Sequence, residues 1–555
     1  MKLLKSSLLA SAAGFAAVAG AQAADLPVKK AVPIEYVRVC SAYGAGFFYI
    51  PGTDTCIRLS GRARLDVGYQ PTGSRSGSNG DTTGYIGLAR INVDARTQTA
   101  YGTLRAFVRL QFASRTGATG GLRSGTQERI GNAFGATGQD QNGRAQQFVN
   151  TDKAFIQFAG LTAGRASSFF DFYAHDFEFA GATANSDLQS TNLLAYTSKL
   201  GDSGLSATIS LEDPTFRRNT IYSQAFGANN AFGPSGTQVG FNVAVTGAPS
   251  PIFTGGANPF TNVDVAQRNR MPDFVGVMRY DAAWGSLQLS AAVKELNTGN
   301  TISGAAGNLS GGVLNPNLAL AGFTGLAPVT GRVASEYGWA IQAGAKINLP
   351  FIAPGDTLYL QGAYGEGATL YTGYSSYNGS YASRASTING AAFDPYMSDA
   401  TLNPFTGKIE LSTSFTVVGS LLHYWSPEWR SAVFASYGEL NFANGARAAN
   451  AAVFQTTGST GQFTGVPGQV SFAVSPVLRD NYQIVAGASI IWSPVKDLDI
   501  GLEGFYTKVG VQNGRVVDMT KSTGAVTAAN IANGSVRTVT ADDTFQLRAR
   551  VQRDF

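Results

Sequence analysis

Residues 57–69 read IRLSGRARLDVGY, and apolar and polar side chains alternate at almost every position. The same alternation recurs in residues 89–96, ARINVDAR, and in residues 104–112, LRAFVRLQF. Successive side chains of a β-strand point to opposite faces of the sheet, so this two-residue period predicts strands with one apolar and one polar face. A soluble sheet would turn the polar face to solvent, whereas a membrane barrel would turn it to a water-filled lumen and its apolar face to lipid.

The polar faces of these three predicted strands carry a row of arginines. Its members are Arg58, Arg62, Arg64, Arg90, Arg96, Arg105 and Arg109. An arginine that faces lipid near the bilayer midplane costs about 2–4 kcal/mol, so lipid could not accommodate so long a row. We therefore expect the row to line the lumen of a barrel, the alternative being the solvated face of a soluble sheet.

The first residues have the pattern of a secretory signal peptide. Lys2 and Lys5 precede an apolar run from Leu8 to Val18, and Ala21-Gln22-Ala23 fits a cleavage site. The run is too short to span a bilayer of about 30 Å. We therefore expect residues 1–23 to be an export signal, followed by a periplasmic segment over residues 24–54 and a β-barrel over residues 55–555.

Composition narrows the class further. No later run of apolar residues is long enough for a spanning helix, so a membrane-spanning form must be a closed β-barrel. The 67 glycines, 34 phenylalanines, 22 tyrosines and 14% charged residues suit many strands joined by tight turns, and they also suit a secreted adhesin. Removal of the signal with its two lysines lowers the net charge from +5 to 5 − 2 = +3, which is too small to indicate a nucleic-acid partner.

Two cysteines, Cys40 and Cys56, flank the start of the first predicted strand. An even number of cysteines in an exported chain favours a disulfide, which would contribute roughly 3 kcal/mol. A structural zinc site needs four ligands, and no histidine lies near this pair. We expect a disulfide and no metal site or cofactor.

Alternating segments divide the chain into sixteen predicted strands. They cover residues 55–69, 84–98, 102–112, 148–159, 161–165, 191–198, 204–212, 272–280, 285–294, 337–348, 357–365, 411–424, 430–438, 481–492, 497–507 and 543–555. Short and long connections alternate between them, which predicts an antiparallel up-and-down barrel with both termini on the side of the short turns.

Aromatic residues support a membrane barrel. Four tryptophans, Trp284, Trp425, Trp429 and Trp492, fall in or beside the short turns, which predicts an aromatic girdle at one membrane interface. The last predicted strand ends at Phe555, which looks like the insertion signal that the barrel-assembly machinery recognises in outer-membrane proteins. Arg553 departs from that signal, whose corresponding position is usually apolar.

Three regions resemble the alphaproteobacterial porins of the rhizobial type. They are residues 36–61, with YVRVC and PGTDTCIRLSG; residues 94–105, with DARTQT and YGTLR; and residues 154–171, with AFIQFAG and GRASSFFD. The resemblance covers the N-terminal third closely and the last strand adequately. It implies a sixteen-stranded outer-membrane porin, usually a homotrimer surrounded by lipid and lipopolysaccharide, through which small hydrophilic solutes diffuse passively.

The resemblance also implies that the third long loop, residues 166–190, folds into the lumen as a constriction loop. This loop would supply the acidic residues Asp171, Asp176, Glu178 and Asp187. Its aromatics would pack it against the wall: Phe169, Phe170, Phe172, Tyr173, Phe177 and Phe179. Acidic and basic sets across a narrow gap would set ion preference, although Asp171 and Glu178 could equally tie the loop to neighbouring backbone amides.

Other classes of protein are less well supported. A serine hydrolase needs a positioned base, and the two histidines, His175 and His423, accompany no Gly-x-Ser-x-Gly motif. We therefore expect no enzyme. A sugar-specific channel or a barrel adhesin remains the alternative, because residues 213–271 and 366–410 form long loops and the tyrosines between Tyr371 and Tyr381 could stack on sugars.

Overall fold

The computed structural model describes residues 38–69, 83–117, 146–187, 190–219, 221–222, 249–255, 260–265, 267–302, 313–314, 327–374, 392–393, 395–455 and 467–555. The predicted signal peptide lies outside these residues. The chain forms two units, residues 1–57 and residues 58–555.

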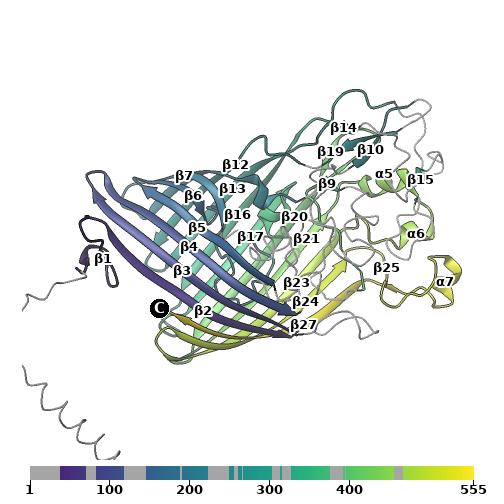
Figure 1. Ribbon diagram of the computed structural model, residues 1–555. Helices are drawn as coiled ribbons and strands as arrows, with labels where there is room; N and C mark the ends of the chain where they lie inside the picture. Colours follow the sequence, from purple (N-terminus) through teal and green to yellow (C-terminus); the bar gives the residue numbers. More distant parts are fainter. Residues whose placement is uncertain are drawn as a thin grey trace, which may run out of the picture. The chain divides into compact units, whose positions relative to one another are not determined.

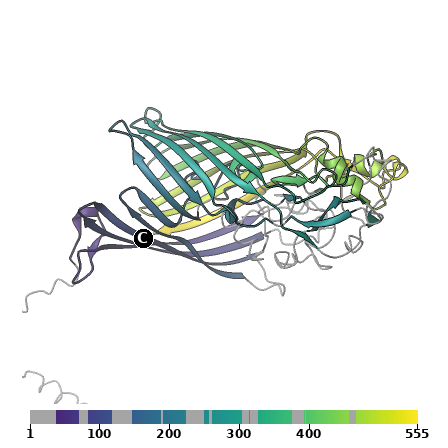
Figure 2. The same ribbon diagram turned by 90° about the horizontal axis from the view of Figure 1, so that it is seen from above.

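The larger unit is a closed antiparallel barrel (Figures 1 and 2). The main sheet has 17 strands, of which the two-residue strand β1 belongs to the smaller unit, so sixteen strands build the barrel. The barrel strands are β2 (Cys56–Tyr69), β3 (Thr83–Thr99), β4 (Gly102–Gly117), β5 (Gln146–Phe158), β6 (Leu161–Ala166), β7 (Thr191–Lys199), β8 (Leu205–Glu212), β12 (Asp273–Ala282), β13 (Gly285–Leu296), β16 (Glu336–Asn348), β17 (Thr357–Glu366), β20 (Thr413–Tyr424), β21 (Trp429–Asn441), β23 (Asn481–Val495), β24 (Leu498–Val511) and β27 (Ala541–Asp554). Each pairs with the next, and β2 pairs with β27 from Arg62↔Asp554 to Tyr69↔Leu547, which closes the barrel. The sixteen predicted strands are confirmed.

The two faces of the strands differ as the alternation predicts. Large apolar side chains stand exposed on the outer face, among them Leu59 at 61% and Ile209 at 70% exposure. Polar side chains such as Asp66, Asp94 and Gln111 are buried on the inner face. Such an exposed apolar surface is what a lipid-facing barrel presents.

Short turns join the strands at one end of the barrel, and the long connections lie at the other. The turn between β5 and β6 consists of Ala159 and Gly160, both with positive φ (48° and 88°), as a two-residue type I′ hairpin requires. A Cβ on Gly160 would lie 2.6 Å from the carbonyl oxygen of Thr197, so this position also lacks room for a side chain.

The long connections carry short elements of their own. These are β9 (Ile221–Tyr222), β10 (Pro249–Phe253), β11 (Phe260–Asp264), β14 (Thr301–Ile302), β15 (Val313–Leu314), β18 (Ala400–Leu402), β19 (Ile409–Leu411), β22 (Phe454–Gln455), β25 (Val516–Val517), β26 (Thr538–Val539), η2 (Pro214–Arg217), α4 (Thr369–Thr372), α5 (Ala446–Val453), α6 (Val470–Ala473) and α7 (Ala528–Ala532). Side chains from several of them share one apolar core, which includes Ile221, Ile252, Val263, Leu402 and Ile409. Within the described chain, none of the helices has the length and apolar character needed to cross a membrane.

The four tryptophans of the predicted girdle and Phe555 are in the described part of the barrel. Trp284, Trp425, Trp429 and Trp492 are between 38% and 68% exposed, and the rings of Trp429 and Trp492 stack at 5.9 Å. The backbone of Phe555 bonds that of Gly61 in both directions, at 2.8 and 3.1 Å. The Phe555 ring covers Gly61 so closely that a Cβ there would lie 2.3 Å from it.

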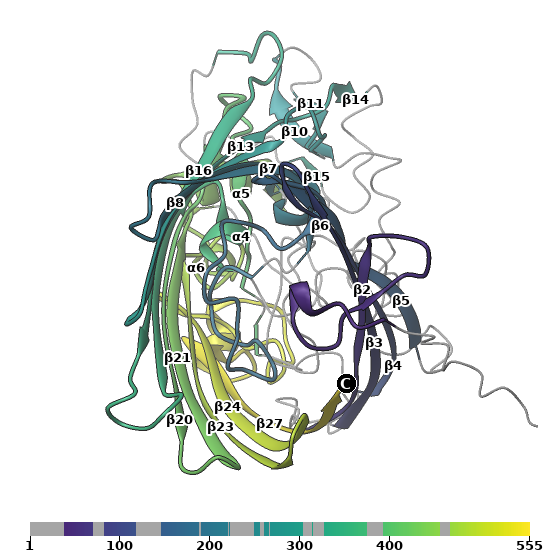
Figure 3. The same cartoon turned by 90° about the vertical axis from the view of Figure 1, so that its left-hand side faces the viewer.

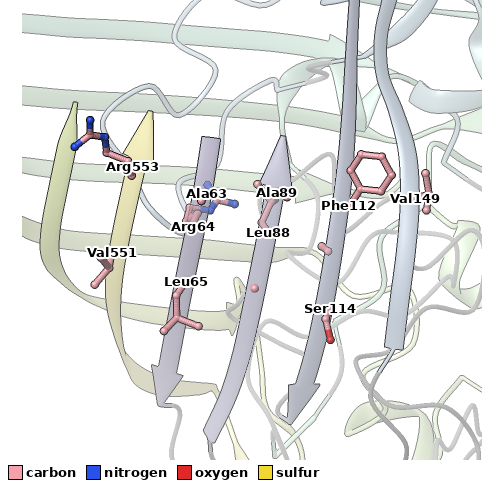
Figure 4. A pocket seen from close by; sticks show the side chains of 12 residues that line it. Ala63, Arg64, Leu65, Leu88, Ala89, Phe112, Ser114, Val149, Val551 and Arg553 are labelled. Carbon is pink, nitrogen blue, oxygen red and sulfur yellow. The ribbon is translucent and has the colours of Figure 1, made fainter. Parts of the chain in front are cut away.

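A hollow of about 820 Å³ lies on the outer side of β27 and β2–β5 (Figure 4). Small residues, Ala63, Gly87 and Ala89, line it between the larger side chains of Leu65 and Phe112. Because these side chains belong to the outward-facing set, the hollow is separate from the lumen.

The N-terminal unit contains the predicted disulfide. Cys40 and Cys56 are joined, with their Cα atoms 6.0 Å apart, and both are at most 2% exposed beside Phe47. The helical turn η1 (Ser41–Tyr43) follows Cys40, and β1 (Phe48–Tyr49) pairs with the residues at the start of β2. The predicted cysteine pairing is confirmed.

Candidate functional site

The connection between β6 and β7 lies inside the barrel over its described residues 167–187 (Figure 3). Its backbone binds side chains on the inner face of the wall. The Nε2 of Gln288 on β13 donates to the carbonyl of Asp171 at 3.1 Å, and the Nε2 of Gln342 on β16 donates to that of Phe170 at 2.9 Å. On β17, the Oε1 of Gln361 accepts from an amide of the same loop, that of Tyr173, at 3.0 Å.

The second half of the loop continues along the wall to the last strand. The Oγ of Ser436 on β21 accepts from the Ala184 amide at 2.8 Å. Glu503 on β24 accepts from the Ala180 amide at 2.8 Å. Arg548 and Arg550 on β27 both donate to the Phe179 carbonyl, at 3.1 and 2.9 Å. The loop therefore follows the wall from β13 to β27.

Two inward-facing glycines make room for the loop's aromatic rings. A Cβ on Gly344 of β16 would lie 2.3 Å from the ring of Phe172, and one on Gly501 of β24 would lie 2.5 Å from that of Phe179. The Phe172 ring also packs edge-on against Tyr359 of β17, with centroids 5.6 Å apart. Phe172 and Phe179 of this loop thus pack against the wall.

Three of the four predicted loop acids are buried in specific contacts. Glu178 is 8% exposed and accepts from the amides of Ala182 and Thr183 at 2.8 and 3.1 Å. Asp171 pairs with Arg217, which η2 carries in from the next long connection. Glu178 therefore stabilises the fold of the loop, and Asp171 ties the loop to a neighbouring one.

The third buried acid, Asp187, pairs with His175. The His175 Nδ1 lies 3.0 Å from the Asp187 carboxylate, and its Nε2 lies 2.8 Å from the Thr183 carbonyl. Burial alone would lower the pKa of His175, but the nearby Glu178 carboxylate and the Asp187 hydrogen bond raise it to about 9. The imidazole is therefore charged at neutral pH and neutralises Asp187.

Asp176 is the exposed acid among the four. The hydroxyl of Tyr359 donates to its carboxylate at 3.1 Å, which fixes the side chain at the edge of the loop. Among the four predicted acids, Asp176 is thus the one whose side chain is exposed to solvent.

The predicted arginine row lies on the inner faces of β2, β3 and β4, which stand across the ring of strands from the loop (Figure 3). We call these inner faces, with that of β5, the arginine wall. Asp94 accepts from both Arg96 and Arg105, at 2.8–3.0 Å. Asp66 accepts from Arg550 at 2.6 Å and lies 3.3 Å from Arg64.

A bulge in β5 adds a base to the wall that the alternation does not predict. Where β5 pairs with β4, Lys153 lies opposite Arg109, and Thr151 lies opposite the next residue, Leu110. Asp152 is therefore an extra residue with no position opposite it on β4. Asp152 is 3% exposed and accepts from Ser190 at 2.6 Å, while Lys153 donates to Ser167. Asp152 and Lys153 therefore both contact the ends of the constriction loop, although strict alternation would put these adjacent residues on opposite faces of the sheet.

Sequence reasoning missed four basic residues of the site. Lys153 is hidden by the bulge, and Arg217 reaches the loop from a distant connection. Arg548 and Arg550, however, alternate with apolar residues in the last predicted strand. The alternation alone therefore indicates that their side chains face the inside of the barrel.

The two histidines lie in different surroundings. His175 belongs to the constriction loop, whereas His423 on β20 pairs with Asp356 at 2.6 Å and packs edge-on against Trp425 at the short-turn end. In the described part of the chain, no group of three or more metal-binding side chains comes together.

Comparison with known proteins identifies the family. A family model described as "Porin subfamily" matches residues 25–536. Porin Omp2b of Brucella suis biovar 1 is 34% identical over 293 residues, 51% of this chain and 64% of Omp2b, and Omp2b of Brucella abortus matches equally. The chain thus spans slightly less than two thirds of the length of these curated relatives.

Among solved structures, the outer-membrane channel DcaP of Acinetobacter baumannii is similar at a TM-score of 0.48 and 13% identity, covering 91% of this chain and 99% of DcaP. The family model extends over most of the chain, from the N-terminal segment to the connection before the last strand. The chain therefore belongs to this porin family of outer-membrane β-barrel proteins.

Proposed function

We propose that the protein forms a water-filled channel for passive diffusion of small hydrophilic solutes and ions across the outer membrane. The observation that carries this proposal is the course of the constriction loop. It follows the wall from β13 to β27 and stands across the ring from β2–β4, the part of the arginine wall that carries the predicted arginine row. A polar passage between the two is a path for solutes that keep their water contacts.

The charges of the passage determine which solutes benefit. Fixed arginines on one side and the Asp176 carboxylate on the other produce a field across the gap. Charged side chains that line a pore set its ion preference, and a field of this kind orients dipolar solutes. Apolar solutes would lose water contacts without gaining others, so the channel discriminates by polarity and size and catalyses no reaction.

We also propose how the protein assembles, on the basis of its membership of the porin family. The protein is exported with residues 1–23 as signal, and the barrel-assembly machinery recognises the last strand with Phe555. The folded barrel forms a homotrimer in contact with lipid and lipopolysaccharide. The tryptophan girdle at Trp284, Trp425, Trp429 and Trp492 fits one membrane interface.

Liposome swelling tests the proposal. Purified protein reconstituted into liposomes should admit uncharged sugars at rates that fall smoothly with solute size and do not saturate with concentration. A saturable rate for one class of sugar would instead support the sugar-specific channel. Liposomes that do not swell in any solute would contradict channel function and favour an adhesin.

A further inference from the structure

Bases outnumber acids on the arginine wall. The acidic residues of β2–β5 are Asp66, Asp94 and Asp152. The basic residues of the same strands are Arg58, Arg62, Arg64, Arg90, Arg96, Arg105, Arg109, Arg115 and Lys153. The basic residues of these strands thus outnumber the acidic ones, and Arg62 pairs with an acid of the neighbouring strand, Asp554 of β27.

Two of the three acids, Asp94 and Asp66, are each shared between two bases. The Asp94 carboxylate lies 2.8 Å from Arg96 and 3.0 Å from Arg105. Asp66 stands in the same way between Arg64 and Arg550. One negative charge between two positive charges leaves each cluster with a net positive charge.

The strongest positive group lies where the loop leaves and rejoins the wall. Arg109 is opposite Lys153 in the register of β4 and β5, and Arg90 is opposite Gln111, two residues from Arg109. Asp152, 3.5 Å from Arg109, is the acid of this group. Because Ser167 and Ser190 at the two ends of the loop contact Lys153 and Asp152, the group stands at the depth of the constriction loop.

The constriction loop does not supply matching negative charge to the passage. Asp171 is paired with Arg217 and Asp187 with His175, one acid to one base. Glu178 is buried among amides of the loop, and Asp176 is exposed. The acid Glu503 lies beneath the loop and accepts from its backbone.

We infer that the passage selects for anions, with Arg90, Arg109 and Lys153 as the group that draws them through the narrow part. This inference rests on the proposed channel function and names its preferred substrate class: small inorganic anions and small carboxylates or phosphates. A wall of fixed positive charge in a confined space raises the local concentration of anions and lowers that of cations. The effect extends over about 10 Å at an ionic strength of 0.1 M.

The reversal potential in a potassium chloride gradient across a planar bilayer tests this inference. We expect its sign to report a chloride permeability greater than that of potassium. A potential of zero or of the opposite sign, recorded from open channels, would overturn the anion preference and leave the proposed function intact. Absence of any channel would instead contradict the proposed function itself.

A charge-neutralising variant identifies the residues responsible. Replacing the group by R90Q, R109Q and K153Q should lower the chloride-to-potassium permeability ratio by about threefold or more, because three charges within screening distance are lost. The matched control removes three positive charges from connections outside the barrel strands, Lys408→Gln, Lys496→Gln and Lys521→Gln, and should leave the ratio unchanged. Equal shifts in both variants would refute the assignment to Arg90, Arg109 and Lys153.

A second variant changes the charge in the opposite direction and keeps an oxygen that can accept from the Tyr359 hydroxyl. Asp176→Asn removes the exposed acid of the loop and should raise the chloride-to-potassium ratio. If the ratio fell instead, the passage would not lie between Asp176 and the arginine wall, and the inference would fail even if the triple variant did not fold.

Discussion

Asp176 and Glu178 are two positions apart, but their carboxylates have different surroundings. Asp176 is exposed and accepts one hydrogen bond from Tyr359, whereas Glu178 is buried and accepts from the amides of Ala182 and Thr183. We therefore expect Asp176 to act on passing ions and Glu178 to hold the loop in its fold.

Glu178→Ala should loosen the constriction loop while the barrel stays folded. The variant leaves buried amides without an acceptor, at a cost of about 1–3 kcal/mol each. Single-channel records should show added current noise, and a protease should cleave the loop faster than in the parent protein. Asp176→Asn is the control and should show neither added current noise nor faster cleavage of the loop. A quiet Glu178→Ala channel would show that the loop does not depend on this carboxylate.

His175 makes the loop sensitive to high pH. Its pKa is raised from 6.5 to about 9 in the folded loop, so the charged imidazole stabilises the loop fully below pH 6.5. This stabilisation is lost as the pH rises toward 9 and the proton leaves. Current noise should therefore increase between neutral pH and pH 10 or so, and His175→Gln should remove this dependence. A parent channel that stayed equally quiet over that range would contradict the role of His175.

At the scale of the elements, the inner faces of the strands are shaped to receive the loop. Gly344 on β16 lies against the ring of Phe172, and Gly501 on β24 lies against that of Phe179. Each glycine stands at a position where the wall would otherwise project a side chain into the loop.

Gly344→Ala should displace the loop from β16. The added Cβ would lie 2.3 Å from the Phe172 ring, and overpacking of this kind costs about 1–3 kcal/mol. We expect a lower melting temperature and an altered single-channel conductance. Gly362→Ala on neighbouring β17 is the control, because its Cβ would lie 3.7 Å from Val417 on the outer face. If both variants behaved alike, the fit between Gly344 and Phe172 would not matter.

The sequence predicts the strands well because alternation is a local property that each strand carries by itself. The range 481–492, for example, is found as β23, extended to Val495. Alternation fails at Asp152, because one extra residue in β5 changes the parity and brings Lys153 to the loop. The surroundings of the loop acids could not be predicted either, because Arg217 and Glu503 approach the loop from distant parts of the chain.

At the scale of the whole molecule, closure of the barrel joins the two ends of residues 58–555. β2 pairs with β27, and Phe555 bonds the backbone of Gly61 and covers its Cα. The last residue is thus part of the seam between the first and last strands.

Phe555→Ala should reduce the amount of folded barrel. The change removes the ring that covers Gly61. Because Phe555 is 67% exposed, this contact is worth only part of the about 1.5–3 kcal/mol that full burial of a phenylalanine contributes. The folded fraction is measured by the change in gel mobility on heating. Phe351→Ala is the control, since Phe351 is 80% exposed in a short turn and should be dispensable. Equal yields from both variants would show that Phe555 does not stabilise the seam.

The position of the passage is the central claim, and access of a bulky thiol reagent to introduced cysteines tests it most directly. The native cysteines are joined in a disulfide, so each variant carries one reactive thiol. Modification at Asp176→Cys or Arg62→Cys, on the two sides of the passage, should lower the single-channel conductance, whereas Ser436→Cys, beneath the loop, should give no change. Conductance that fell at Ser436→Cys and stayed constant at the other two would place the path of solutes behind the loop and contradict the account.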